Sequence, residues 1–352
     1  MRVEKRVLAR LTKCYSIAPL IYKGKYHFMV AAEKIDRCIL FDETGREVDT
    51  IWEGPGGVMT MVPIPGREGQ FLATQKFYSP NDSKEAKLVV VTSREDGAWE
   101  VKTLAELPFV HRFDILAGNH EYYLIACTLK SGHEYQDDWR SPGKVYGAVL
   151  PKDFRVFNEE HQLEFTVLKE GLLKNHGYYK TKKGDTEAAI VSSANGVFRF
   201  TPPRQREEAW EITELISEPA SDAVLLDLDE DGKEELAVIS PFHGDTFTIY
   251  KEQNGVYQSI YKHPDKMEFL HAIYGGMLCG RPQVVIGYRK GDRSLLSCYY
   301  DKSAETYRME VLDRDCGPAN VFHYMLNQKD IIIAANRETD EIAMYTVTSQ
   351  EA

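Results

Sequence analysis

The sequence lacks any apolar run near the roughly eighteen residues that a membrane-spanning helix needs. Its first residues, MRVEKRVLARL, carry charges inside what would have to be the apolar region of a signal peptide. The sequence therefore excludes a helical membrane protein. We expect a cytoplasmic protein that has no membrane partner.

Cysteine is scarce and shows no metal-binding or disulfide spacing. The six cysteines lie far apart, form no CxxC pair and mostly sit inside apolar runs; they are Cys14, Cys38, Cys127, Cys279, Cys298 and Cys316. This pattern is typical of reduced thiols in a core rather than of a disulfide or zinc framework.

Positive charge is also in short supply. The chain has 43 Lys and Arg against 54 Asp and Glu, which gives a net charge of -11. Because nucleic-acid binding needs clustered Lys and Arg to neutralise phosphates, this balance argues against a nucleic-acid partner. A neutral small molecule, or an anionic one held locally, remains compatible with it.

What the sequence does contain is a repeat of short apolar strands with turn residues between them and no helical period. In each unit the second strand begins near one of seven positions, His27, Phe71, Tyr123, Ala188, Leu236, Val284 and Ile331, which are spaced by 44, 52, 65, 48, 48 and 47 residues. Four-stranded units of this length predict an all-β, seven-bladed β-propeller formed by one domain over residues 1–352. The competing interpretation, two unrelated β-sandwiches, leaves the near-constant period unexplained.

The last unit lacks a fourth strand, and the N-terminal VEKRVLARL resembles the outer strands of other units. We therefore expect the N-terminal strand to pair as the outer strand of the last blade and close the ring, which removes exposed sheet edges. The predicted blades cover residues 13–54, 57–108, 110–172, 175–216, 221–263, 270–314, and 322–348 together with 2–12.

One acidic loop carries a recognisable cation-binding pattern. Its carboxylates stand at alternate positions around Gly232, and the expected calcium set is Asp227, Asp229, Asp231, Lys233 and Glu235. The loop resembles the DxDxDGxxEL loop of the FG-GAP/VCBS repeat family, whose members form propeller blades. The resemblance implies a structural calcium ion, and the alternative is a solvated acidic hairpin that binds no metal.

Histidines recur at the start of the first strand in four blades. They are His111, His176, His271 and His323, and Asp222 stands at about the same position in blade 5. Since innermost strands line the channel of a propeller, we expect these side chains to share one divalent transition metal, Mn, Zn, Fe or Ni. The alternative is that each histidine is an ordinary hydrogen-bonded residue.

Polar loops between the second and third strands should surround the same mouth of the channel. The long loop of blade 3 and the last blade supply side chains suited to a sugar hydroxyl, a pyranose face or a carboxylate. The expected substrate-binding residues are Glu134, Asp137, Trp139, Arg140 and Arg337.

A propeller with channel histidines is similar to the metal-dependent carbohydrate lyases and dehydratases, such as aldos-2-ulose dehydratase and oligogalacturonate lyase. That resemblance implies β-elimination on a keto-sugar or uronate substrate. His133 or His243 would act as the base, while Arg289 or Lys290 would stabilise negative charge. A non-catalytic protein- or ligand-binding propeller and a metal-dependent sugar hydrolase or lactonase remain open, and the oligomeric state is left unassigned.

Overall fold

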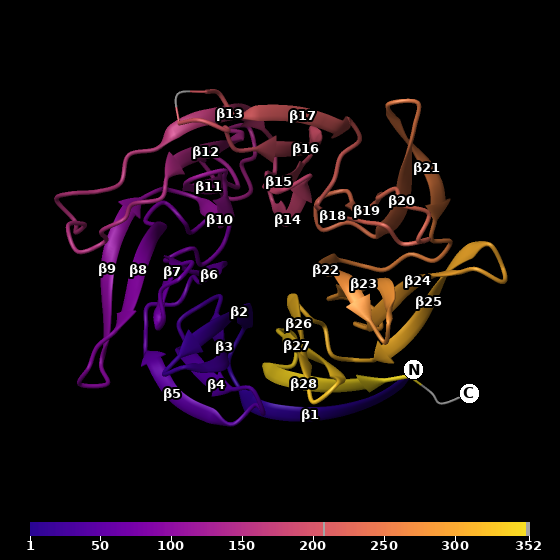
Figure 1. Cartoon of the computed structure of the whole chain (residues 1–352), viewed down its shortest axis with the longest axis horizontal. Coiled ribbons are helices and arrows are strands. Elements are labelled where there is room, and N and C mark those ends of the chain that lie inside the picture. Colours follow the sequence, from indigo (N-terminus) through magenta and orange to yellow (C-terminus); the bar gives the residue numbers. More distant parts are fainter. Residues whose placement is uncertain (207, 350–352) are drawn as a thin grey trace.

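Twenty-eight strands form seven antiparallel sheets of four in the computed structural model, which describes residues 1–206 and 208–349. The sheets stand around a common axis (Figure 1). No helix occurs among the described residues, and none of them forms a helix able to cross a membrane. The prediction of an all-β, seven-bladed β-propeller is confirmed.

The first three blades follow one another from the innermost strand outward. Blade 1 contains β2 (Cys14–Tyr22), β3 (Lys25–Ala32), β4 (Cys38–Asp42) and β5 (Glu47–Trp52). Blade 2 contains β6 (Met61–Pro63), β7 (Gln70–Gln75), β8 (Lys87–Ser93) and β9 (Trp99–Glu106). Blade 3 contains β10 (Val110–Ala117), β11 (Tyr122–Thr128), β12 (Gly143–Val149) and β13 (Thr166–Leu172).

The next three blades repeat this order. Blade 4 contains β14 (Gly177–Lys183), β15 (Thr186–Ser193), β16 (Gly196–Thr201) and β17 (Glu211–Ile216). Blade 5 contains β18 (Asp222–Leu226), β19 (Glu235–Ser240), β20 (Thr246–Gln253) and β21 (Val256–Lys262). Blade 6 contains β22 (Leu270–Leu278), β23 (Arg281–Tyr288), β24 (Leu295–Asp301) and β25 (Thr306–Asp313).

Blade 7 joins the two ends of the chain. It contains β26 (Asn320–Leu326), β27 (Lys329–Asn336), β28 (Glu341–Thr348) and, as its outer strand, β1 (Arg2–Arg10). β1 and β28 are antiparallel, with Arg2 opposite Thr348 and Arg10 opposite Glu341. The predicted closure by the N-terminal strand is therefore confirmed, and Figure 1 shows the first and last strands side by side.

The core is divided among the blade interfaces. The second strand of each blade is mostly buried, and most third strands have a buried stretch, so these segments are short apolar runs in the sequence. Seven hydrophobic clusters form, each mainly between two neighbouring blades; Phe71 with Met29 and Phe198 with Ile125 are examples. All six cysteines are unpaired and five of them are buried, as expected for core thiols.

The same backbone conformation precedes the innermost strand in six of the blades. In six blades a residue with positive φ precedes the start of the strand, and these residues are Lys13, Gly57, Phe109, Lys174, Phe269 and Gly317. The residue two positions later is Tyr15, Met59, His111, His176, His271 and Ala319, respectively. In blades 1, 3 and 6 that residue is also bulged out of the strand register. A bulge redirects a side chain, so in blades 1, 3 and 6 the local geometry turns this residue toward the axis.

Candidate functional site

Seven side chains, one from each blade, form a ring around the axis at the start of the innermost strands. We call this set the axial ring, and its members are Tyr15, Met59, His111, His176, Asp222, His271 and Ala319. All of them are buried, with at most 4% of each residue exposed. The ring brings together three of the four predicted histidines and Asp222.

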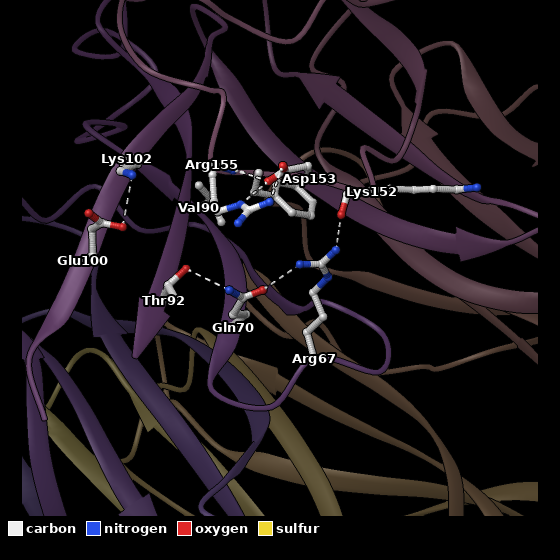
Figure 2. A pocket seen from close by; sticks show the side chains of 10 residues that line it. Arg67, Gln70, Val90, Thr92, Glu100, Lys102, Lys152, Asp153 and Arg155 are labelled. Atoms are coloured by element: carbon white, nitrogen blue, oxygen red, sulfur yellow. Dashed lines mark hydrogen bonds and ion pairs between the residues drawn. The ribbon is translucent and has the colours of Figure 1, made fainter. Parts of the chain in front are cut away.

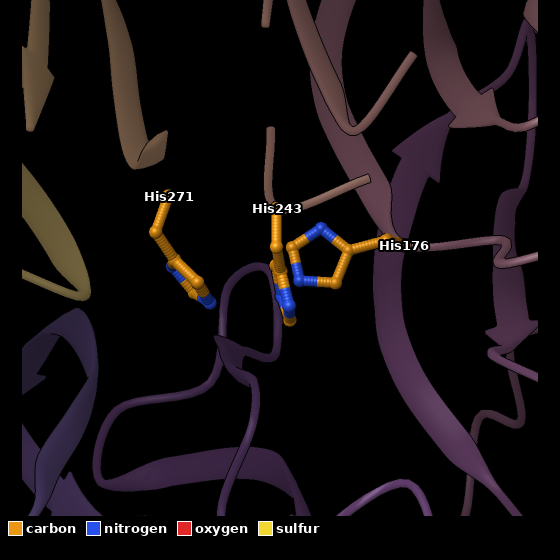
Figure 3. Close-up of side chains that lie close together, drawn as sticks. All are labelled: His176, His243 and His271. Carbon is orange, nitrogen blue, oxygen red and sulfur yellow. The ribbon is translucent and has the colours of Figure 1, made fainter. Parts of the chain in front are cut away.

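His176, His243 and His271 lie close together beside the axis (Figure 3). One nitrogen of each imidazole lies within 4.8 Å of a nitrogen of the other two. His176 and His271 belong to the axial ring, whereas His243 comes from the loop between β19 and β20. His243, expected as a base on the rim, is instead part of the histidine cluster.

Two hydrogen bonds fix which nitrogen faces the centre of the cluster. Nδ1 of His271 lies 2.7 Å from the carbonyl oxygen of Ala319, and Nδ1 of His176 lies 3.2 Å from that of Ser221. Because a carbonyl only accepts, each Nδ1 must carry the proton. Nε2 therefore keeps its lone pair, which is the form that ligates metal ions.

Two phenylalanines hold the third imidazole. The ring of His243 stacks against Phe242 at 3.9 Å and against Phe269 at 4.4 Å between centroids. Its backbone has a φ of 50°, in the left-handed region that non-glycine residues seldom adopt. The stacking therefore compensates for an unfavourable backbone and gives His243 a defined orientation.

Burial keeps the imidazoles neutral. Loss of solvent, with a smaller contribution from the charge of Arg112, lowers the pKa of His176 to about 3. Burial also lowers the pKa of His111, His243 and His271 well below its ordinary value. At neutral pH the cluster offers lone pairs rather than positive charge, as metal ligation requires.

Several buried polar atoms of the region have no hydrogen-bond partner among the described residues. They are Nδ1 of His111, Nε2 of His176, Nε2 of His243 and Oδ1 of Asp222. Buried polar atoms are rarely left unpaired, so these atoms are able to bind a ligand. Three imidazole nitrogens fit a transition metal such as zinc, manganese, iron or nickel.

Tyr15 and Asp222 complete the polar surroundings. The Tyr15 hydroxyl lies 3.1 Å from Nε2 of His271 and 3.5 Å from Nε2 of His111. Burial raises the pKa of the Asp222 carboxyl to about 7, and its Oδ2 lies 3.8 Å from Nδ1 of His176. The carboxyl therefore exchanges a proton in the physiological range.

His323 does not join the ring, which corrects the expected set of four histidines. It is the fourth residue of β26, roughly 13 Å along the strand from Ala319 at about 3.3 Å per residue. There its Nε2 pairs with Asp330 at 2.7 Å and its Nδ1 meets the Tyr274 hydroxyl at 3.2 Å. The positive φ of Gly317 assigns the ring position of blade 7 to Ala319 instead.

The acidic loop has a partner that the sequence pattern did not indicate. The ammonium of Lys251 lies 2.6 Å from Asp229, 2.9 Å from Asp231 and 2.5 Å from Glu235. Asp227 accepts hydrogen bonds from the backbone amides of Asp231 and Gly232. The lysine thus stands among the carboxylates that were expected to bind calcium, while Lys233 contributes a backbone amide to Asp231.

The charged side chains expected to bind substrate in blade 3 are engaged in contacts within the protein. Arg140 pairs with Glu134 at 2.7 Å and with Asp138 at 2.9 Å. The carboxylate of Asp137 accepts a hydrogen bond from the side chain of Asn81. These contacts stiffen the long loop.

Two aromatic side chains of the same loop face the protein. Trp139 packs edge-to-face on Phe242, with 5.3 Å between centroids. His133, an expected base, lies against Phe109 with 5.9 Å between ring centroids, and its Nε2 is buried. The loop therefore supports the stack that holds His243, and His133 is not in the histidine cluster.

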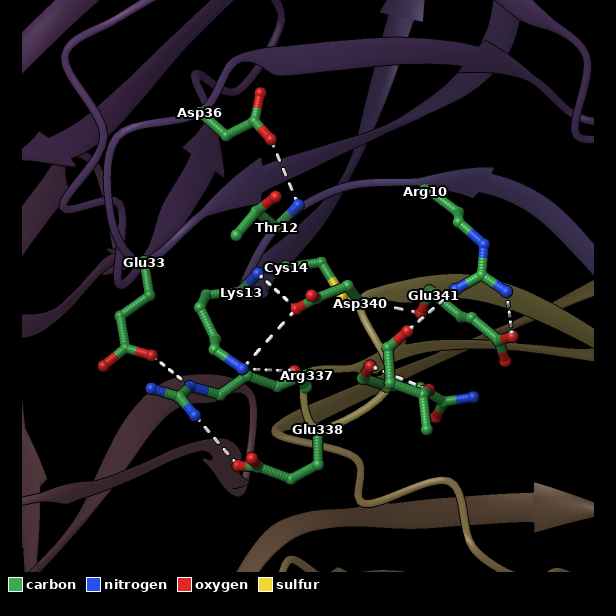
Figure 4. A network of polar contacts seen from close by, with 12 residues as sticks. Arg10, Thr12, Lys13, Cys14, Glu33, Asp36, Arg337, Glu338, Asp340 and Glu341 are labelled. Atoms are coloured by element: carbon green, nitrogen blue, oxygen red, sulfur yellow. Dashed lines mark hydrogen bonds and ion pairs between the residues drawn. The ribbon is translucent and has the colours of Figure 1, made fainter.

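The expected cations of blades 6 and 7 lie in a network of ion pairs. Arg289 pairs with Glu338 at 2.7 Å, and Arg337 pairs with both Glu33 and Glu338 (Figure 4). Lys290 lies over the ring of Phe269 at 5.3 Å. The two arginines are already neutralised by carboxylates, so little of their charge is left for a ligand.

A pocket of about 540 Å³ lies away from the ring, on the outer strands of blade 2 (Figure 2). Within it Arg155 pairs with Asp153 at 2.8 Å and Lys102 with Glu100 at 3.2 Å. Because these charges are paired inside the pocket, we assign it no function.

Comparison with known proteins gives the fold and nothing finer. No family model matches the chain, and no curated protein matches it. The β-propeller domain of Cps50 (Swd1) from Myceliophteria thermophila is similar, with a TM-score of 0.61 and 11% identity over 98% of this chain and 100% of that one. A candidate 6-phosphogluconolactonase from Bacteroides uniformis has a TM-score of 0.52 and 13% identity over 93% and 90%. The chain is a seven-bladed β-propeller whose function rests on its own residues.

Proposed function

We propose that this protein is a metal-dependent enzyme that acts on a keto-sugar or uronate, by β-elimination, beside the axial ring. His176, His243 and His271 would hold a divalent transition metal through one nitrogen each. The observation that carries the proposal is the convergence of these three nitrogens within 4.8 Å, with two Nδ1 protons tied to carbonyl groups.

A metal ion at this place would act as a Lewis acid on a carbonyl or carboxylate oxygen. The chain itself supplies a base, because His111 is neutral, lies outside the three-histidine set and has an unpaired Nδ1. Its ring centroid lies 4.7 Å from that of His176. His111 therefore replaces His133 and His243 as the group proposed to take the proton next to the carbonyl.

Tyr15 provides a hydroxyl between two imidazoles. Burial raises the pKa of this phenol to about 12, so it stays protonated and can donate a hydrogen bond to a developing negative charge. Arg289 and Lys290 were expected in that role. Tyr15 suits it better, because Arg289 is paired with Glu338.

A non-catalytic binding propeller is the second candidate. The observation that favours it is the burial of the ring, since no ring residue is more than 4% exposed. An enzyme needs side chains around the ring to open to substrate, whereas a binding module can use the outer loops alone.

Elimination is tested directly by the ultraviolet absorbance of an unsaturated sugar product. Metal-loaded protein is incubated with oligomeric uronates and with keto-sugars, and His111→Gln serves as the matched variant. New absorbance that the variant loses by about a hundredfold or more would support the proposal, as expected for a general base. New reducing ends without absorbance would identify a hydrolase. Absence of any product from metal-loaded protein would favour the binding module.

A further inference from the structure

Arg112 stands beside the axial ring without a carboxylate partner. It follows His111 on β10, the innermost strand of blade 3. Its guanidinium donates a hydrogen bond of 3.1 Å to the carbonyl oxygen of Met59 in blade 2 and lies 5.8 Å from the centre of the Tyr15 ring in blade 1. A side chain that spans from blade 3 to blades 1 and 2 must lie near the axis.

The positive charge of Arg112 affects the ionisable residues of the axial ring. It lowers the pKa of His176 in blade 4, Asp222 in blade 5 and His271 in blade 6, in each case as a smaller effect than burial. The contacts with Met59 and Tyr15 place the guanidinium beside the axial ring.

No compensating anion reaches this cation within the described residues. Its guanidinium there donates to a backbone carbonyl rather than to a carboxylate, and its Nε is buried without a hydrogen-bond partner. Asp114, two residues further along β10, is paired with Lys180 at 2.9 Å. The carboxylate of Asp222 lies beside His176, 3.8 Å from its Nδ1, and forms no ion pair with Arg112.

Unlike Arg112, the two arginines nearer the surrounding loops have carboxylate partners. Arg289 and Arg337 both pair with Glu338, and Arg337 also pairs with Glu33. An arginine presents several donors suited to a planar carboxylate, so one without a counterion favours an anionic partner.

Arg112 is more open to solvent than the axial ring. The residue is partly exposed although its strand is innermost, and so are Asp114 and Lys180, which continue along the same strands away from the ring. The ring residues themselves are buried. A small ligand that enters between the innermost strands would therefore meet Arg112 before it meets the histidines.

We propose that Arg112 binds the carboxylate or oxyanion of a small anionic ligand on the axis of the propeller, beside the axial ring. The ligand chemistry is a compact oxyanion, which either a sugar acid or a free inorganic anion provides. This site does not depend on the proposed metal or reaction, because it follows from an uncompensated cation that solvent reaches.

The test is calorimetric binding to chelator-treated protein, with three probes: D-glucuronate, D-glucose as the neutral analogue, and inorganic phosphate. We expect at least one of the two anions to bind and D-glucose not to bind. In Arg112→Gln the affinity should fall by about tenfold or more, the size expected for a hydrogen bond to a charged group. Arg155→Gln, at an exposed arginine between β12 and β13, is the control and should bind as the parent does.

Binding of glucuronate alone would identify a sugar acid as the ligand class, and binding of phosphate would identify an inorganic oxyanion. Equal affinity of Arg112→Gln and the parent, or equal binding of D-glucose and D-glucuronate, would overturn the proposal. If the Gln variant does not fold, crystals of the parent soaked in bromide give the same answer. An anomalous peak beside the guanidinium supports the site, and peaks confined to the outer surface overturn it. Because metal is removed throughout, failure here leaves the proposed metal function to be judged by metal content and product.

Discussion

The hydroxyl of Tyr15 lies 3.1 Å from Nε2 of His271, although the two residues are 256 positions apart in the sequence. This contact joins blade 1 to blade 6 across the axis, so the ring is narrow enough for its members to share one small ligand. It also means that a metal ion on His271 would compete with the hydroxyl for the same lone pair.

We predict that Tyr15→Phe lowers the free energy of unfolding of the metal-free protein by about 1 kcal/mol, because Nε2 of His271 loses its donor inside the core. The loss should be smaller in metal-loaded protein, where the ion takes up that lone pair. Urea denaturation with and without metal measures both values. An equal loss in the two states would show that the hydroxyl and the metal do not share His271.

Stability should fall as the pH drops below about 6.5. The buried histidines bind a proton in the unfolded chain near that pH, whereas His176 in the folded protein does so only near pH 3. The unfolded state then holds more protons, so each such histidine contributes a slope of up to about 1.4 kcal/mol per pH unit between these limits.

Asp222 acts in the opposite direction, because its folded pKa of about 7 lies above the unfolded value. Its contribution is greatest below about pH 4 and is lost as the pH rises through 7. We therefore expect Asp222→Asn to steepen the loss of stability on acidification, as measured by denaturation midpoints from pH 7 to 4. An unchanged slope would mean that the Asp222 pKa is ordinary.

We expect Lys251 to stabilise the folded protein through its ion pairs with the acidic loop. Lys251→Met leaves Asp229 and the fully buried Glu235 without their cation, and we expect a loss of about 3 to 4 kcal/mol, at the lower end of the usual cost of removing one partner of a buried pair. Lys233→Met, in the same loop, should change stability little. Calcium should stabilise the Lys251 variant more than the parent, because the ammonium no longer occupies the site. Strong stabilisation of the parent by calcium would instead show that the ion displaces the lysine.

Deletion of residues 2–10 should destabilise the whole ring. It would expose the edge of β28 and remove the ion pair between Lys5 and Asp313 at 2.8 Å. An open edge promotes association between molecules, so light scattering on heating should begin at a lower temperature than in the parent. A truncated protein that stays monomeric with an unchanged melting temperature would show that closure is dispensable.

The sequence predicts the fold well because the propeller is periodic. Each unit repeats the same alternation of buried strands and turns, and the missing fourth strand of the last unit leaves β1 as its partner. The ring positions of His111, His176, His271 and Asp222 follow from the same repeat, because each stands where an innermost strand begins.

The other site residues depend on features that the repeat does not encode. His323 was misplaced because the ring position follows a positive-φ residue, and in blade 7 that residue is Gly317. His243 reaches the cluster through the path of a loop and its stacking on Phe242. The contact of Lys251 with the acidic loop could have been predicted from strand pairing, because Lys251 lies directly opposite Glu235 in the pairing of β19 and β20.

Metal content after dialysis against zinc or manganese is the most direct test of the proposed site. We expect about one ion per chain in the parent and in His323→Ala, which lies outside the ring, and a loss of that ion in His271→Ala and His176→Ala. Circular dichroism should confirm that all variants keep the β fold. A parent that binds no ion, or a His271→Ala variant that keeps it, would rule out the proposed metal site.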